Sequence, residues 1–268
     1  MSDEKTGETV SIFDLARGRG LDEQVAHPGR DAPRLPKRFY KVAAALPQDG
    51  GYAIQLDGKT VKTPSRQALV VPAEKLAAAI VAEWAAQGDT INPRRMWHTK
   101  LANTALDLVL PRRDAVINDI VTFAQSDLVC YRAEGPQVLV ARQVKSWDRL
   151  LDWLLQTTGA RLNVTTGIVH VAQDAEALDA LRKAVETFDA FGLTGLHNAV
   201  TLTGSAVIGL ALLKGHIDAA AAFEAAHLDE FWQMELCGED EEEAARLALR
   251  KSELEATDLF VRLARNEA

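Results

Sequence analysis

Apolar residues recur with a period of two from Phe39 onward, which is the signature of a half-buried strand. Tyr52, Ile54 and Leu56 fall on one face of a second such segment. Residues 68–71 give a further short apolar run that suits a strand. The pattern therefore predicts a small antiparallel sheet whose first strand begins at Phe39.

Asp57 and Gly58 come directly after the second strand. This pair readily takes the positive φ angles of a tight hairpin turn, and Lys59 and Thr60 resume an extended pattern. Gly58-Lys59-Thr60 also looks like the end of a phosphate-binding loop. That motif needs a glycine where Ala53 stands, and it needs a helix to follow. We therefore interpret the segment as a hairpin.

A helical period replaces the strand period after residue 71. Pro72 suits the first position of a helix that runs to Gln87, and Leu76, Ile80 and Trp84 share one of its faces. Further helices are expected at residues 99–110, 112–125, 136–157, 178–188, 194–213, 217–236 and 241–265. Residues 161–171 look extended. The segment 194–213 is apolar almost all round, which predicts a place at the centre of the helical part.

These elements predict an α+β fold with two domains. Residues 38–95 form the smaller, mainly β domain, and residues 96–268 form the larger, mainly helical domain. Residues 1–37 carry little apolar content and are expected to be a mobile lead-in. A short amphipathic patch at residues 11–16 is the part of this lead-in that could dock.

Composition narrows the class of protein. The chain has 268 residues and a net charge of −8, which argues against a nucleic-acid binder, because such proteins normally show a basic face. No run approaches the ~20 apolar residues that span a bilayer, so membrane insertion is not expected. The acidic N-terminus suits neither a secretory signal nor a mitochondrial presequence. The cytoplasm of a bacterium is the expected compartment.

Candidate chemistry is sparse. His227 and Glu230 lie three apart on one helix, but no second histidine or close cysteine pair completes a metal site. Cys130 and Cys237 are expected to be buried free thiols. Ser205 after Gly204 is read as a small residue that permits close helix packing. We expect no catalytic residue, no cofactor and no metal, and therefore no enzyme.

Asp229, Glu230 and Gln233 stand beside Phe231 and Trp232 on one predicted helix. Either the tryptophan anchors this helix through a core face formed with Leu228 and Leu236, or the polar residues recognise a partner beside apolar surface. The sequence leaves both readings open. The acidic run at residues 239–243 favours a solvated helix start over a second partner-binding patch.

Seven short motifs occur in order along most of the chain. They are Arg38-Phe-Tyr-Lys41, Leu56-Asp-Gly-Lys59, Lys62-Thr-Pro64, Glu83-Trp84 with Gln87, Asp127-Leu-Val-Cys-Tyr-Arg132, Trp147-Asp148 and Leu228-Asp-Glu-Phe-Trp-Gln233. In this order they resemble the assembly chaperone family that handles the α subunit of the F-type ATP synthase, found in mitochondria and some bacteria.

The resemblance implies a single-client chaperone that holds the free α subunit at a surface later covered by the β subunit. It implies that Glu230 is the critical partner-binding residue and that Trp84 is structural. From the pattern of the same predicted helix, Asp229 and Gln233 are expected to bind the partner beside Glu230, and Trp232 is expected to be structural. It also implies a monomer when free, and a mitochondrial matrix location for eukaryotic relatives. Many relatives carry tryptophan where Cys237 precedes Gly238 here, which puts the packing at that point in question.

Two other classes of function remain open at this stage. A small-molecule enzyme could use a cleft between the two domains, where ligand sites are common. A general holdase would bind many clients through mobile, often methionine-rich surface, but the chain has only three methionines.

Overall fold

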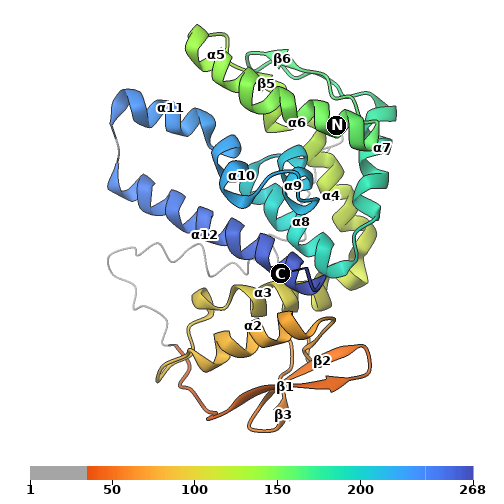
Figure 1. Ribbon diagram of the computed structural model, residues 1–268, viewed down its shortest axis with the longest axis vertical. Helices are drawn as coiled ribbons and strands as arrows, with labels where there is room; N and C mark the ends of the chain where they lie inside the picture. The colour runs from red at the N-terminus through yellow and green to blue at the C-terminus, as the bar shows by residue number, and fades with distance from the viewer. Residues whose placement is uncertain (1–34, 239, 268) are drawn as a thin grey trace, which may run out of the picture.

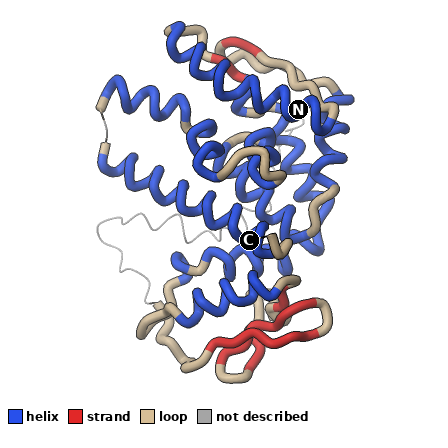
Figure 2. Tube along the Cα trace, in the orientation of Figure 1, coloured by secondary structure: helices blue, strands red, loops and turns tan. Residues whose placement is uncertain are grey.

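The structure is a computed structural model that describes residues 35–238 and 240–267 (Figure 1). A four-stranded sheet lies at one end of the molecule and helices fill most of the rest (Figure 2). The small strand region comes first in the chain and the mostly helical region follows, so the predicted α+β fold is confirmed. The predicted lead-in, including its amphipathic patch, lies almost entirely outside the described residues.

The sheet is built around its second strand, β2, which pairs antiparallel with the other three. The strands are β1 Ala43–Gln48, β2 Gly51–Leu56, β3 Lys59–Thr60 and β4 Val70–Val71. Between β2 and β3, φ is 48° at Asp57 and 77° at Gly58. Both values are positive, as a type I′ turn requires, so the predicted hairpin is confirmed.

The first strand starts at Ala43, so its predicted start at Phe39 is wrong. The backbone N–H groups of Lys41 and Val42 donate to the Asp57 carboxylate at 2.8–3.1 Å instead of to a neighbouring strand. These hydrogen bonds favour the ionised form and hold the pKa of Asp57 below its usual value. Phe39 is left 74% exposed, whereas Tyr40 turns into the core.

Helix α2, Glu74–Ala85, packs against β1 and β2. It begins later than predicted, because Ala73 is extended and serves as the N-cap, which leaves Pro72 outside the helix. Leu76 and Ile80 are fully buried, as their shared face predicts. Trp84 continues that face and is half-buried.

The helical region is a bundle of mostly short helices together with the long helix α12 (Figure 1). Its helices are α3 Trp97–Thr104, α4 Arg113–Gln125, α5 Gln137–Gln143, α6 Arg149–Thr158, α7 Ala175–Glu186, α8 Ala190–Thr203, α9 Ala206–Leu213, α10 Ala219–Ala226, α11 Leu228–Cys237 and α12 Glu241–Ala264. A widened π-helical turn, η6 Val144–Asp148, joins α5 to α6. Only β6, Thr165–Thr166, is strand within the segment expected to be extended, and it pairs with β5, Tyr131–Arg132.

Two of the predicted long helices are each divided. The helix expected at residues 194–213 breaks at Gly204, whose φ of 68° is left-handed and ends α8. The hydroxyl of Ser205 accepts the N–H of Ile208 and caps α9, so Ser205 is not a spacer inside a helix. The helix expected at 217–236 breaks at His227. Every residue of α9 is buried, which confirms the central place of this segment.

Asp127 fixes the start of α9 from 78 residues away along the chain. Its carboxylate is fully buried and accepts hydrogen bonds from the Ser205 hydroxyl at 2.5 Å and the Val207 N–H at 3.1 Å. Burial disfavours the charged form more than these donors favour it, and the pKa of Asp127 rises to about 6. The first residue of the Asp127–Arg132 motif is therefore a structural capping group.

This carboxyl group predicts a pH-dependent stability. Because its pKa is about 6 in the folded state and 3.8 in the reference state, the folded protein holds the proton more tightly. Its contribution to stability is present below pH 4 and is lost as the pH rises through 6. Between pH 5 and pH 7 the wild type should lose about 1 kcal/mol of unfolding free energy relative to Asp127→Asn. Urea unfolding of both proteins at the two pH values measures this difference, and an unchanged difference would contradict it.

One hydrophobic core runs through both regions and includes Ile54 of the sheet and Phe260 of α12. The Glu83 carboxylate on α2 also accepts the N–H groups of His98 and Thr99 at the start of α3, at 2.7 and 2.8 Å. It thereby satisfies donors that a helix start leaves free.

The domain boundary between residues 95 and 96 stays a prediction. Within residues 35–238 and 240–267, none of the helices has the length and apolar character to cross a membrane.

Candidate functional site

Helix α11 carries the three predicted partner-binding residues and lies at the edge of the helical region, between α5 and α12 (Figure 1). Leu228, Phe231 and Met234 pack against the core. The core stripe expected to include Leu236 is wrong, because that side chain is 62% exposed. A stripe at i, i+3 and i+6 drifts the opposite way round the helix from one at i, i+4 and i+8, so Phe231 and Met234 face the core in place of Trp232 and Leu236.

Trp232 is half-buried and faces α5. The guanidinium carbon of Arg142 lies 4.9 Å from the centroid of its ring, within range of a cation–π interaction. The indole therefore touches a neighbouring helix through a charged group at the surface. Its structural role stays a prediction.

The side of α11 that faces α5 is held by polar contacts. The Asp229 carboxylate accepts a hydrogen bond of 2.8 Å from the side-chain amide of Gln143, which is almost fully buried. Nearly two turns further along α11, Arg142 donates to Glu235 at 2.7 Å, and this hydrogen bond lowers the pKa of Glu235. Asp229 is exposed, but part of its hydrogen-bonding capacity is already used by Gln143.

Glu230 faces α12. Its carboxylate is 40% exposed and lies 3.9 Å from the guanidinium of Arg246, which also pairs with Glu243. The ring of His227 lies 4.0 Å away on the other side. Burial lowers the pKa of His227. Burial thus disfavours the charged imidazole, and Arg246 is the permanently charged cation beside Glu230.

Gln233 is exposed on the outer side of the helix. Asp229, Glu230 and Gln233 are thus brought together within about one helical turn, at i, i+1 and i+4. Trp84 lies elsewhere, near the sheet, where its ring meets Tyr40 edge-on at 5.5 Å. The structure does not bring it to α11, and its structural role stays a prediction.

The cysteine prediction holds for one residue only. Cys130 is buried, and burial raises the pKa of its thiol to about 12. Cys237 is exposed, because the last turn of α11 extends beyond the core. Across the described ranges, His, Cys, Asp and Glu side chains form no group of three that could hold a metal ion.

Arg142 and Gln143 on α5 and Arg246 on α12 also shape this site, and the sequence reasoning missed them. Arg142 lies 93 residues from Glu235, and Gln143 lies 86 residues from Asp229. No motif or spacing connects positions so far apart. Only the docking of α11 between two other helices identifies them.

Comparison with known proteins agrees with the motif pattern. A family model described as ATP12 chaperone protein matches residues 37–155. The crystal structure of Atp12 from Paracoccus denitrificans is 40% identical, with a TM-score of 0.81 over 86% of this chain and 99% of that one. The Atu1473 protein of Agrobacterium tumefaciens is 37% identical, with a TM-score of 0.82 over 94% and 96%.

A more distant relative is the protein named atp12, mitochondrial, of Schizosaccharomyces pombe. It is 24% identical over 209 residues, which span 74% of this chain and 72% of the relative. The bacterial structures match nearly their full length at 37–40% identity, so the likeness covers both the sheet and the helical region. The resemblance carried by the ordered motifs is confirmed, and the chain belongs to the ATP12 chaperone family.

Proposed function

We propose that this chaperone of ATP synthase assembly binds the free α subunit of the F-type enzyme and promotes formation of the catalytic head. It holds α at a surface that the β subunit later covers, because only a competing surface makes the chaperone removable. It acts by binding alone, without catalysis or a cofactor. Family membership supports the assembly role.

The observation that carries the choice of surface is the arrangement of α11. Leu228, Phe231 and Met234 anchor the helix inward, so Glu230 and Gln233 can be presented outward on a fixed support. Binding to a helix that is already ordered costs less conformational entropy than binding to a helix that becomes ordered only on contact. The proposal therefore assigns Asp229, Glu230 and Gln233 to the client-binding surface.

The proposal includes action as a monomer in the cytoplasm of a bacterium. The bacterial relatives are more similar in sequence than the fission yeast protein, at 37–40% against 24% identity. The decisive experiment is co-expression with the α subunit of the same organism, followed by size-exclusion chromatography. A stable complex with free α, and none with the assembled head, supports the proposal. Equal binding to free α and to the assembled head would refute it.

Charge reversal at Glu230 is the sharpest test of the surface. Glu230→Lys should change the unfolding free energy by no more than about 1 kcal/mol, since a partly exposed ion pair contributes about 0–1 kcal/mol. At an interface, the same reversal sets like charge against a basic partner group and costs several kcal/mol of binding. The expected result is a normal thermal melt with binding of α weakened at least about tenfold.

Glu255→Lys is the matched control, because Glu255 is an exposed acid on α12 outside the proposed surface. It should bind α like the wild type. A well-folded Glu230→Lys protein that still supports ATP synthase assembly in a deletion strain would remove Glu230 from the site. A collapsed melt would instead make Glu230 a structural residue.

A further inference from the structure

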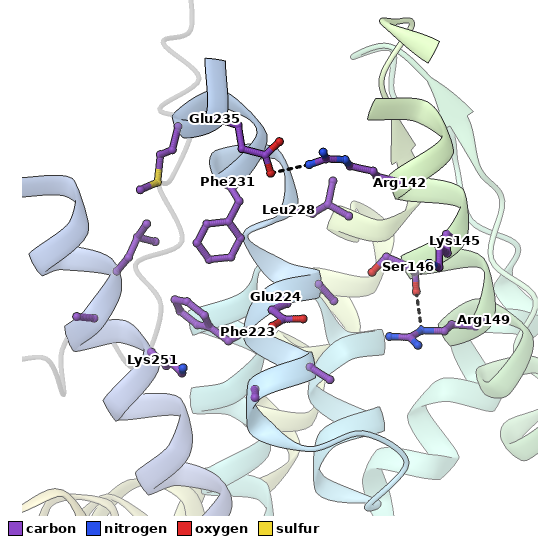
Figure 3. Close-up of a pocket in the computed structure, with 16 residues that line it drawn as sticks. Arg142, Lys145, Ser146, Arg149, Phe223, Glu224, Leu228, Phe231, Glu235 and Lys251 are labelled. Atoms are coloured by element: carbon purple, nitrogen blue, oxygen red, sulfur yellow. Dashed lines mark hydrogen bonds and ion pairs between the residues drawn. The ribbon is translucent and has the colours of Figure 1, made fainter. Parts of the chain in front are cut away.

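A groove of about 920 Å³ opens beside α11, and neither Asp229 nor Glu230 is among the residues that line it (Figure 3). Its walls come from the end of α5, η6 and the start of α6 on one side and from α12 on the other, with α11 along a third side. Its floor is α10, where Ala220, Ala221 and Ala225 line the hollow. Because these alanine side chains are short, they leave the groove open between the larger side chains of the surrounding helices.

The apolar part of the groove is continuous with the core. Phe223 of α10 and Leu228 and Phe231 of α11 lie between the two walls (Figure 3). Leu228, Phe231 and Met234 are only partly buried, so their outer edges face the groove. An occupant can therefore bury apolar surface here, and that burial is the main favourable term in most protein association.

The rim carries an excess of positive charge in a chain whose net charge is −8. Arg142, Lys145 and Arg149 line one wall, and Lys251 lies on the opposite one (Figure 3). The acids that line the groove are Glu224 and Glu235.

Most of these cations form no ion pair with another described residue. Glu235 pairs with Arg142 at 2.7 Å. Among the described residues, Lys145 and Lys251 form no ion pair, and the hydrogen bond recorded for Arg149 goes to the Ser146 carbonyl at 3.3 Å. Among the described residues, three cations therefore line the groove without an ion pair, against one acid, Glu224, that lines it without an ion pair.

We infer that this groove docks an amphipathic segment of the client α subunit that presents acidic residues beside an apolar face. The inference rests on the proposed function and adds to it a second contact region with its own chemistry. The apolar face of the segment lies on Phe223, Leu228 and Phe231, and its acids meet Lys145 and Arg149. A groove with this pattern is the usual acceptor for an amphipathic helix. The client is the chosen occupant because the basic walls are complementary in charge to an acidic segment, and the proposed function supplies the α subunit as the protein that binds here.

Charge reversal on the basic wall tests the inference. The variant Lys145→Glu with Arg149→Glu places two acids where the segment presents its own, and both positions are exposed, so the fold should be kept. Binding of purified α subunit should weaken at least about tenfold, with a smaller dependence on salt than in the wild type. The control is Lys183→Glu, an exposed lysine on α7 that does not line the groove; it should bind α normally.

Protection of an engineered cysteine from chemical labelling gives a second measurement, which does not depend on charge. In a Cys237→Ser background, Ala220→Cys puts a thiol on the exposed groove floor, and Ala78→Cys puts one on the exposed face of α2. Bound α subunit should slow maleimide labelling at residue 220 more than at residue 78. Protection at 220 together with weakened binding of the reversed variant supports the inference.

The outcomes separate the two proposals. If the wild type does not bind α, the proposed function and the groove inference both fail. If the wild type binds α, but the reversed variant binds equally well and residue 220 stays reactive, only the groove inference is overturned. If reversal of the wall raises the affinity for α, the inference is also overturned, because the groove then holds an acidic segment of this chain that competes with the client.

Discussion

Trp84→Arg is expected to destabilise the protein by about 3 kcal/mol and to lower its melting temperature by roughly 6–12 °C. The indole packs against the main core and against a smaller cluster formed by Tyr40, Leu56, Ile91 and Met96, and it meets the Tyr40 ring edge-on. The Arg38 guanidinium already lies 4.7 Å from that tyrosine ring and donates to the Gln87 carbonyl at 2.5 Å. A second guanidinium at position 84 would lose the packing and face like charge as well. Thermal melts and soluble yield measure the effect.

Trp84→Phe is the matched control. The indole N–H is buried and has no hydrogen-bond partner among the described residues, so phenylalanine keeps most of the ring and leaves no acceptor without a donor. Its cost should be about 1 kcal/mol or less. If Trp84→Arg melted like the wild type but failed to bind the α subunit, Trp84 would belong to an interface and its structural role would be rejected.

Trp147→Ala is expected to lose about 3–5 kcal/mol of unfolding free energy, the largest effect of any single change considered. Trp147 is 1% exposed and joins the end of η6 to the core. Its N–H donates to the Ala225 carbonyl at 2.8 Å, which is one of the last carbonyls of α10 and has no partner within that helix. The Arg132 guanidinium also lies 5.2 Å from the ring and would lose that contact.

Trp147→Phe separates the ring from its hydrogen bond. It should cost about 1–3 kcal/mol, because the buried Ala225 carbonyl is left without a donor. The two tryptophans are thus expected to differ in their response to the same substitution: the change to phenylalanine is mild at 84 and costly at 147. Urea unfolding of the four variants tests this, and equal costs for the two phenylalanine variants would contradict the hydrogen-bond argument.

Local sequence determined the elements that depend on local geometry. Asp57 and Gly58 predicted the hairpin turn, because few other pairs accept two positive φ angles in succession. Leu76 and Ile80 predicted the buried face of α2, because helical spacing alone places them together. The predicted start of the first strand was wrong because a side chain takes the place of a neighbouring strand: the Asp57 carboxylate accepts hydrogen bonds from the N–H groups of Lys41 and Val42.

The breaks inside long apolar segments show a second limit. Gly204 ends α8 and Ser205 caps the start of α9, which are common roles for these residue types. Because the residues on both sides are apolar, the hydrophobic pattern alone does not reveal this break. The Ser205 cap is completed by Asp127, a residue in another part of the chain. The pattern of apolar residues indicates which residues are buried. It does not change where one buried helix ends and the next buried helix begins.

For the candidate site, the sequence by itself determined that Asp229, Glu230 and Gln233 share a short stretch of one helix, and its ordered motifs determined the family. Only the tertiary structure decided which face of α11 turns inward, that Arg142 and Arg246 flank it, and that α10, α12 and the Lys145–Arg149 wall enclose a basic groove. The reason is physical: dihedral preferences and periodicity act over a few residues, whereas the neighbours of a helix are set by the docking of whole segments, some of them as distant in sequence as Arg142 and Glu235, 93 residues apart.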